Sequence, residues 1–326
     1  MNPALPKQPK IDAIRKSGVK NRLPAWFKQD IPDATVRGRI QLLSEFKVNT
    51  VCCEARCPNL SFCFKNLKFT FMILGNICTR NCRFCGVRKS GTVLKTSENC
   101  PQHGDSSASA REPSLYIDLD EPYRISQIAK ILNLKFVLIT SVTRDDLTDG
   151  GAAQFVKTIE LIHSIDKNIK IEVLIPDFSG NIASLKTVID ARPSILAHNI
   201  ETVNRLYKTL RPKANYQTSL DVLKKSKEIN PLLITKSSLI LGLGESEEEI
   251  IYTMEDLRYN QCDILTLGQY LAPSQRHYPV KEFISIEQFQ RYRRIGLGLG
   301  FKAVLSGPKV RSSYHAEEVL GELEYV

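Results

Sequence analysis

Apolar and polar positions follow two different rhythms along most of the chain after about residue 68. Short runs rich in Ile, Leu and Val have the length and composition of buried strands, and the stretches between them repeat apolar residues every three or four positions, as amphipathic helices do. The predicted strands are 68–75, 135–141, 170–177, 195–200, 235–242 and 264–270, with a weaker seventh at 301–306. The predicted helices include 152–165, 202–210, 217–228 and 246–260, the last opened by a capping box of Ser246 and Glu249.

Regular alternation of strand and helix predicts parallel strands joined by right-handed crossovers. Six or so such units predict an α/β fold built as a full or partial barrel, with a doubly wound open sheet as the alternative. Residues 1–50 are basic and punctuated by prolines, which predicts an extended N-terminal arm with a helix near 35–45. Residues 89–118 are polar and rich in Ser, Pro, Gly and Glu, which predicts a long surface loop.

Composition excludes several classes of protein. With 326 residues, 42% of them apolar and 25% charged, the chain resembles neither a collagen, a disordered chain nor a small disulfide-stapled domain. There is no apolar run long enough to span a membrane, and the first thirty residues lack the apolar stretch of a secretory signal. We therefore expect a cytoplasmic protein that does not associate with membranes.

The chain is basic, with a formal net charge of +10. Such a charge favours acidic partners, although it also serves solubility. There is no block of consecutive basic residues and no regular interleaving of basic with aromatic residues, so the sequence gives little support to nucleic-acid binding.

Cysteine placement is the strongest chemical signal. Seven of the nine cysteines fall between Cys52 and Cys85. A disulfide framework fits badly because the count is odd and no secretory signal precedes it. In a reducing compartment such a cluster indicates a metal site, and thiolates are soft ligands that point to zinc or iron–sulfur.

Cys78, Cys82 and Cys85 form the pattern C-x3-C-x2-C directly after the first predicted strand. That position is the carboxyl end of a barrel strand, where the active sites of such folds lie. Three thiolates can hold three corners of a four-iron cube and leave the fourth iron open. A structural zinc site would need a fourth ligand, and none stands nearby at the usual spacing.

A second set lies upstream. Cys52, Cys57 and Cys63 form C-x4-C-x5-C and again supply only three thiolates. Cys53, Cys100 and Cys262 are interpreted as bystander thiols, since a free cysteine often behaves as a small hydrophobe.

The pattern C-x3-C-x2-C, with Phe84 just before its last cysteine, resembles that of the radical S-adenosylmethionine superfamily. The resemblance implies a partial (β/α)6-type barrel in which Cys78, Cys82 and Cys85 hold a [4Fe–4S] cluster. Its open iron would bind S-adenosylmethionine, which is cleaved to a 5′-deoxyadenosyl radical.

Taken together, the two cysteine patterns resemble the lipoyl synthase family, and the resemblance runs from about residue 20 to 316. Further matching segments are ITSVTRDDLTDGGA, HNIETV, LRPKANY, LGLGE, LTLGQYLAPSQRHYPV and GPKVRSSYHA. The chain departs from the family at Cys53, where an acidic residue is usual, and in the length of 89–118. The implied organisation is an N-terminal arm (1–66) carrying the second motif, a barrel core (67–310) and a C-terminal tail (311–326) with the RSSY motif.

The resemblance also implies the site and the reaction. Cys52, Cys57 and Cys63 would hold an auxiliary [4Fe–4S] cluster, with Ser313 as its fourth ligand, and the family consumes this cluster as its sulfur source. The reaction places sulfur at C6 and C8 of an octanoyl chain on a carrier-protein lysine, using two S-adenosylmethionine molecules. Both clusters must then face one cavity, and the N-terminal arm could fold its cysteines across the mouth of the barrel.

The implied partners are octanoylated carrier domains, namely 2-oxoacid dehydrogenase E2 subunits and the glycine cleavage H protein. A low-potential donor such as ferredoxin or flavodoxin would supply electrons. Asn199 and Glu201 end the fourth predicted strand, where they could bind the cofactor's ribose or amino group, and Arg211 could pair with its carboxylate. Alternatively these three residues only cap the turn.

Other interpretations stay open at this stage. Another sulfur-inserting radical S-adenosylmethionine enzyme would share the first motif but place its auxiliary cysteines elsewhere. A two-cluster electron carrier would need four cysteines per cluster, and a zinc-stabilised nucleic-acid-binding module would need zinc ligands. Asp145, Asp146 and Asp149 look like a metal loop, yet with Gly150 they fit a tight turn and helix start better. His277 fits either a substrate-proximal role or a surface position.

Overall fold

The computed structural model describes residues 24, 27, 31–91, 115–313 and 316–324. Its centre is a sheet with strands in the order β1-β2-β5-β6-β7-β8-β9-β10. Every neighbouring pair from β2 to β10 is parallel, and only β1 pairs antiparallel, with Asn49 opposite Met72. The bounds are β1 Asn49–Thr50, β2 Thr70–Ile73, β5 Phe136–Ser141, β6 Lys170–Leu174, β7 Ile195–Ala197, β8 Ile234–Leu241, β9 Ile264–Gln269 and β10 Ala303–Gly307.

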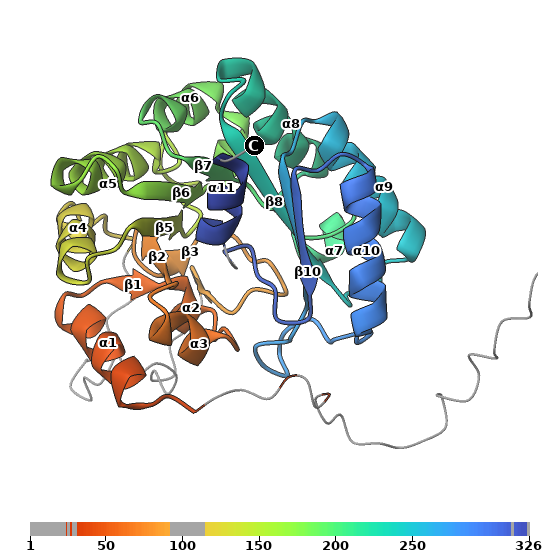
Figure 1. Ribbon diagram of the computed structural model, residues 1–326, viewed down its shortest axis with the longest axis horizontal. Coiled ribbons are helices and arrows are strands. Elements are labelled where there is room, and N and C mark those ends of the chain that lie inside the picture. Colours follow the sequence, from red (N-terminus) through yellow and green to blue (C-terminus); the bar gives the residue numbers. More distant parts are fainter. Residues whose placement is uncertain (1–23, 25–26, 28–30, 92–114, 314–315, 325–326) are drawn as a thin grey trace, which may run out of the picture.

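Strand order follows chain order from β2 to β10, which is the arrangement of a barrel, but no pairing joins β10 to β1 among the described strands. The sheet is therefore a partial barrel with two edges. Helices cover its outer surface (Figure 1): α4 Glu121–Ile131, α5 Ala152–Ile165, α6 Ile182–Asp190, α8 Tyr216–Ile229, α9 Glu247–Tyr259 and α10 Ile286–Gly298. Right-handed βαβ crossovers place helices on this side of a parallel sheet.

All seven predicted strands are present, most of them trimmed at their ends. The predicted helix 152–165 is exact, and the capping box of Ser246 and Glu249 opens α9 as expected. The predicted helix 202–210 is instead a 3₁₀ turn, Asn204–Leu206, followed by α7 Tyr207–Leu210. Helices α4, α6 and α10 were not predicted.

Most of the first thirty residues of the predicted arm lie outside the described part of the chain, and the helix expected near 35–45 is confirmed. Residues 34–65 are compact rather than extended. They fold as α1 Ala34–Glu45, α2 Val51–Glu54 and α3 Leu60–Lys65, beside β1 and β2 (Figure 1). Val36, Ile40 and Leu43 of α1 and Phe64 of α3 belong to the same buried core as β2 and β5. Burial of these apolar side chains fixes the upstream cysteines against the first barrel strand, which an extended segment would not do.

The C-terminal segment spans the open side between the two sheet edges. Near its start, Asn59 Nδ2 donates to the carbonyl oxygen of Lys309 at 2.6 Å, and further on Lys68 pairs with Glu318. Val319 and Leu320 of α11 Ala316–Glu324 pack on Ile195 and Ile264, which begin β7 and β9. Helix α11 of the tail thus lies at the amino ends of the strands, away from their carboxyl ends.

Most of the loop predicted at 89–118 lies outside the described residues. Arg88 and Lys89 form the short strand β4. Residues 115–118 lead into α4 without regular structure.

Candidate functional site

The first cysteine motif forms a loop at the carboxyl end of β2. The short strands β3 Ile77–Cys78 and β4 Arg88–Lys89 pair in parallel and close its base. Ser90 N donates to Cys78 O at 2.9 Å, and Cys85 N donates to Cys82 O in a tight turn. The sequence predicted the site at this end of the barrel, the carboxyl end of the strands.

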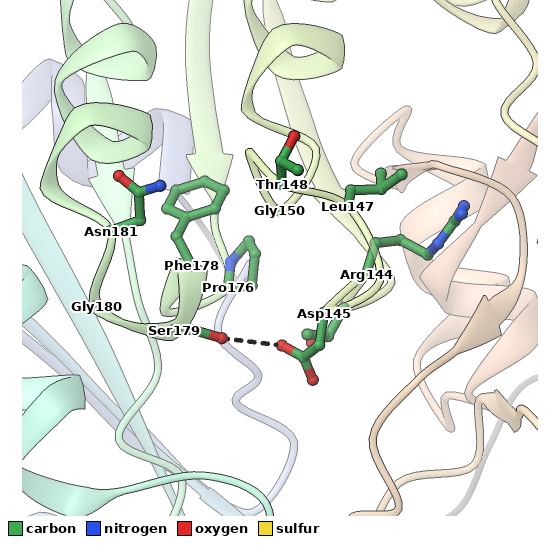
Figure 2. Close-up of a pocket in the computed structure, with 11 residues that line it drawn as sticks. Arg144, Asp145, Leu147, Thr148, Gly150, Pro176, Phe178, Ser179, Gly180 and Asn181 are labelled. Atoms are coloured by element: carbon green, nitrogen blue, oxygen red, sulfur yellow. Dashed lines mark hydrogen bonds between the residues drawn. The ribbon is translucent and has the colours of Figure 1, made fainter.

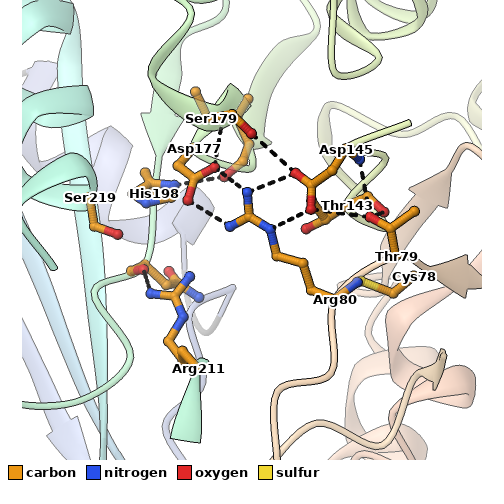
Figure 3. Close-up of polar contacts among 12 residues, drawn as sticks. Cys78, Thr79, Arg80, Thr143, Asp145, Asp177, Ser179, His198, Arg211 and Ser219 are labelled. Carbon is orange, nitrogen blue, oxygen red and sulfur yellow. Dashed lines mark hydrogen bonds and ion pairs between the residues drawn. The ribbon is translucent and has the colours of Figure 1, made fainter. Parts of the chain in front are cut away.

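Arg80, inside this loop, binds two strand ends at once (Figure 3). Its Nε and Nη2 donate to both carboxylate oxygens of Asp145 at 2.9 and 2.8 Å, and its Nη1 and Nη2 donate to Asp177 at 2.6 Å each. Arg80 is only 6% exposed. Although burial opposes it, the charge and hydrogen bonds of Arg80 lower the pKa of Asp177 to about 2. Asp177 therefore stays ionised and holds the loop against the ends of β5 and β6.

Further contacts hold the loop to neighbouring turns. Thr79 N donates to Thr143 O at 3.0 Å, after β5. The segment around the end of α7 contributes two contacts. Lys213 Nζ donates to Thr79 O at 3.0 Å, and Leu210 O accepts from Arg83 N of the loop at 2.9 Å. The cysteine loop is thus positioned by several barrel turns.

The aspartates of TRDDLTDGG do not form a metal site. Asp149 accepts hydrogen bonds from Gly151 N and Ala153 N and so starts α5, as the turn interpretation predicted. Asp146 pairs with Arg144, and Asp145 with Arg80.

The three thiols of the loop lie near one another. The charges of Cys82 and Cys78 both act on Cys85, and burial, the largest effect, raises the pKa of Cys85 to about 12. Burial also raises the pKa of Cys82. Burial therefore favours the protonated thiols of Cys82 and Cys85, and binding of iron would displace their protons. The donor set of three thiols suits an iron–sulfur cluster with one open iron.

Asn199, Glu201 and Arg211 come together beside Cys82. Asn199 Nδ2 donates to Glu201 Oε1 at 3.0 Å, and Arg211 donates to the phenol oxygen of Tyr207 at 2.8 Å while interacting with Glu201 and Cys82. Burial raises the pKa of Glu201. Two buried polar atoms of this group, Asn199 Oδ1 and Arg211 Nε, find no hydrogen-bond partner among the residues that the structure describes. Orphaned buried polar atoms cost free energy, and a polar ligand such as the amino acid part of S-adenosylmethionine would satisfy them.

The second cysteine set surrounds the α2–α3 turn. The hydroxyl of Thr50 accepts a hydrogen bond from Cys53 N and so caps the start of α2. This contact fixes the backbone at Cys52. A hydrogen bond that the Cys52 thiol donates to Cys63, followed by burial, raises the pKa of Cys52, and Cys57 interacts with Cys52 and with Arg311 of the tail. The three predicted cysteines are therefore neighbours, and the tail reaches them.

The tail can approach the second cysteine set because β9 has a glycine, Gly268, where the two segments cross. A Cβ on Gly268 would lie 2.0 Å from Val310 O, so only glycine lets the backbone after β10 pass so close. Ser312 and Ser313 then line the same cavity as Cys52, Cys57 and Cys63. The prediction for Ser313 rested on the family resemblance, and the structure puts this residue in the cavity with that set.

One cavity of about 730 Å³ is lined by all three cysteines of the second set and by Cys85 of the first. Besides Cys52, Cys57 and Cys63 its lining includes Cys85, Asn199 and Glu201, whereas Cys78, Cys82 and Arg211 are not among its lining residues. Leu138, Leu174 and Ile240 form an apolar part of the wall. Glu172 also lines it and pairs with the buried Lys236 at 3.0 Å.

Two of the three cysteines outside the predicted ligand sets belong to the described residues, and both are buried. Cys262 is buried and donates to Ile264 O at 3.3 Å, and burial raises its pKa to about 12, as expected for an inert thiol. Cys53 is buried beside Cys52 in α2. Cys100 lies outside the described residues. Within the described ranges no three His, Cys, Asp or Glu side chains are spaced for a single metal ion; ligands of a four-iron cube bind separate iron atoms and stand further apart.

Four residues near the cysteines were missed from the sequence. Arg80, Asp177 and Arg311 gave no local signal, because each acts through partners distant in the chain. His198 is buried, with Nδ1 near Ile175 O at 2.9 Å, and burial lowers its pKa to about 4. His277 lines the cavity, and its Nε2 lies 3.2 Å from Cys85 O, which favours the site-proximal of its two interpretations.

A smaller cavity of about 360 Å³ lies between the turns that follow β5 and β6 (Figure 2). Ser179 Oγ donates to Asp145 Oδ1 at 3.3 Å across it. It has no cysteine in its lining, and its main relation to the site is that Asp145 also binds Arg80.

Comparison with known proteins decides the family. Residues 72–257 match the model of the radical SAM superfamily. The lipoyl synthase of Caldanaerobacter subterraneus subsp. tengcongensis is 48% identical over 296 residues, which cover 91% of this chain and 96% of that protein. The lipoyl synthase of Aquifex aeolicus is 49% identical over 280 residues, covering 86% and 94%. This chain belongs to the lipoyl synthase family.

Solved structures agree on the fold. HydG, a maturase of the [FeFe]-hydrogenase, matches with a TM-score of 0.50 at 14% identity over 88% of this chain and 66% of that one. SuiB of Streptococcus suis bound to its precursor peptide also matches with a TM-score of 0.50, at 12% identity over 76% and 52%. As a lipoyl synthase family member with the radical S-adenosylmethionine fold, the chain is an enzyme that uses a [4Fe–4S] cluster and S-adenosylmethionine. In the described part of the chain, no helix combines the length and apolar character needed to cross a membrane.

Proposed function

We propose that this enzyme inserts two sulfur atoms, at C6 and C8, into an octanoyl chain carried on a lysine of a carrier domain. Two molecules of S-adenosylmethionine would be consumed per product, and a second [4Fe–4S] cluster would be the sulfur donor. The observation that carries the proposal is the single cavity lined by members of both cysteine sets, by Asn199 and Glu201 and by Ser313.

Each part of the cavity has a role in this proposal. Cys78, Cys82 and Cys85 hold the first cluster in a loop that Arg80 fixes to the barrel. Bound together, this cluster and S-adenosylmethionine supply abstraction of hydrogen from an unactivated C–H bond, which no side-chain acid or base could ionise. The unpaired Asn199 Oδ1 and Arg211 Nε receive polar groups of the cofactor.

The opposite side of the cavity supplies sulfur in this proposal. Cys52, Cys57 and Cys63 hold the second cluster, and Ser313 is its fourth ligand. A serine oxygen is a harder and weaker partner for iron than a thiolate, which suits a cluster that is consumed. Leu138, Leu174 and Ile240 give the octanoyl chain an apolar wall between the two sets and exclude water from it.

The proposed partners follow from the substrate. Octanoylated E2 subunits and H protein would present the acyl lysine at the cavity mouth, and a ferredoxin or flavodoxin would deliver low-potential electrons. A cytoplasmic location remains a prediction from the sequence.

Anaerobic turnover tests the proposal. The reconstituted protein is incubated with an octanoyl-lysine peptide, a reductant and S-adenosylmethionine, and the peptide is weighed by mass spectrometry. We expect a gain of two sulfur atoms, with 5′-deoxyadenosine as co-product, and about eight irons and eight sulfides per chain. Zinc without sulfide would instead support a zinc-stabilised module, and iron without sulfur transfer would support an electron carrier.

Two substitutions separate the roles of the cysteine sets. Cys52→Ala should retain cleavage of S-adenosylmethionine and lose sulfur transfer, whereas Cys82→Ala should lose both. Cys262→Ala removes a buried thiol away from the cavity and is the matched control, so it should retain both. Sulfur insertion by Cys52→Ala at the wild-type rate would contradict the assignment of the second set.

A further inference from the structure

Arg311 is the one tail residue before Ser313 that places a positive charge against the second cysteine set. Its side chain lines the cavity, and it interacts through hydrogen bonding and charge with Cys57 and through charge with Cys63. Its Nη1 donates to the carbonyl oxygens of Val310 at 2.6 Å and Pro308 at 3.3 Å. One side of the guanidinium is therefore fixed to its own backbone and the other faces the thiols.

The charge of this guanidinium lacks an ordinary counter-ion. Within the described part of the chain, the groups that favour its charged form are the thiols of Cys57 and Cys63, and no carboxylate is paired with it. A guanidinium stays protonated in proteins, and a buried cation is costly unless an anion opposes it. A negatively charged group held by these cysteines would oppose this cation.

We propose that Arg311 is a positioning residue that compensates the negative charge of the cluster held by Cys52, Cys57 and Cys63, and so sets its reduction potential and retention. The inference rests on the proposed second [4Fe–4S] cluster. Such a cluster is net negative, because three thiolates outweigh the charge of the oxidised core, and an alkoxide ligand adds to this. Hydrogen bonds and charges around the sulfurs are known to tune cluster potentials.

The position of the charge is set in advance. Gly268 admits the tail backbone over β9, and Asn59, within the second motif, donates to Lys309 O at 2.6 Å. The guanidinium therefore needs little reorganisation when the cluster is present, which makes its electrostatic effect larger than that of a mobile surface cation.

The test uses the full chain with Cys78, Cys82 and Cys85 changed to alanine, so that only the second cluster can form. In this background Arg311→Gln removes the charge but keeps hydrogen-bonding capacity, and Arg311→Lys keeps the charge. Arg294→Met is the matched control, because it removes one positive charge from an exposed position on α10. Readouts are iron content, the midpoint potential from an EPR-monitored redox titration, and the rate of iron loss to a chelator.

We expect about four irons per chain in the triple-alanine background. Arg311→Gln should shift the midpoint potential to more negative values, since reduction adds negative charge beside a site that has lost its cation. It should also release iron roughly tenfold faster, the factor expected for one charge-assisted hydrogen bond. Arg311→Lys should recover most of both effects, and Arg294→Met should match the parent.

The outcomes separate the two claims. If the triple-alanine protein holds no iron, the second cluster and this inference both fail. If it holds the full iron complement and Arg311→Gln leaves the potential and the iron-loss rate unchanged, only the role of Arg311 is overturned. The role of Arg311 is also overturned if the midpoint potential shifts equally in the glutamine and lysine variants while the metal-free proteins have equal melting temperatures. The charge at this position would then not be the cause of the shift in potential.

Discussion

Arg80 illustrates what spacing along the sequence cannot reveal. The cysteines around it can be recognised from the sequence, because candidate ligands on one loop are close together in the chain. The partners of Arg80, by contrast, are 65 and 97 residues away, and only the barrel brings the ends of β5 and β6 to the cysteine loop. Arg311 and Ser313 reach the second set in the same indirect way. The two cysteine sets were therefore readable from the chain, and the distant residues that contact them were not.

Breaking the Arg80 network should be costly. Arg80→Met leaves Asp177, 3% exposed, without its counter-ion, and we expect a loss of about 3 kcal/mol in the free energy of unfolding, as for other broken buried pairs. Arg205→Met is the control, because Arg205 pairs with Glu249 at a largely exposed site and should cost at most about 1 kcal/mol. Urea unfolding of the metal-free proteins measures both. Equal losses in the two variants would show that the Arg80 network is not a stabilising anchor.

His198 should make stability depend on pH. Burial lowers its pKa in the fold from 6.5 to about 4, so between these values the unfolded chain binds a proton that the folded chain does not. Stability contributed by the neutral imidazole is thus complete above pH 6.5 and falls as the pH drops towards 4, by about 3 kcal/mol in all.

Urea unfolding of the metal-free protein at pH 7.5 and pH 5 should therefore show a drop that is smaller in His198→Gln. His163→Gln, at a half-buried position on α5, is the matched histidine control and should follow the wild type. An identical drop in wild type and His198→Gln would contradict the assignment to His198.

At the scale of elements, the strands were predictable because most of them are short, largely buried runs rich in apolar residues. In β9, for example, every residue is buried. Helix α10 was missed although its start is legible: Ser285 and Gln288 form a capping box, and Phe289 and Tyr292 follow on one face. The two helices of the second motif are only four and six residues long, too short for any periodicity to identify. Their form depends on packing against β2 rather than on local propensity.

The close packing of β9 against the tail requires a residue without a side chain at Gly268. In Gly268→Ala the new Cβ would lie 2.0 Å from Val310 O, so either β9 or the tail must shift. We expect a loss of about 2 kcal/mol in the free energy of unfolding, typical of overpacking. Gly298→Ala, on α10 with no atom within 4 Å of its Cβ, should be neutral or stabilising by about 0.5 kcal/mol. Chemical unfolding of both variants is the measurement, and equal stability of the two would contradict the close approach.

At the scale of the whole molecule, the site is assembled from both ends of the chain. The fold class followed from the strand–helix rhythm, but the contact between Asn59 and Lys309 joins residues 250 positions apart. Neither periodicity nor composition specifies such a contact. It determines which end of the open barrel receives the tail, and hence that Ser312 and Ser313 face the cysteines.

The net charge of +10 should show itself in the reaction with a carrier protein. Arg56 and Lys89 act on His277 at the cavity, so part of this charge lies where an acyl lysine would enter. We expect a carrier domain with an acidic surface to be attracted to this charge, which raises the association rate until salt screens it, over a Debye length of about 10 Å at 0.1 M. Raising the salt from about 0.05 to 0.3 M should therefore lower kcat/KM for an octanoylated carrier roughly tenfold, while kcat/KM for a neutral octanoyl-lysine peptide changes less than about twofold. Comparing the two substrates in the same salt series controls for effects on the clusters, since such effects would slow both equally. A carrier rate that is constant across the series would mean that the basic surface plays no part in docking.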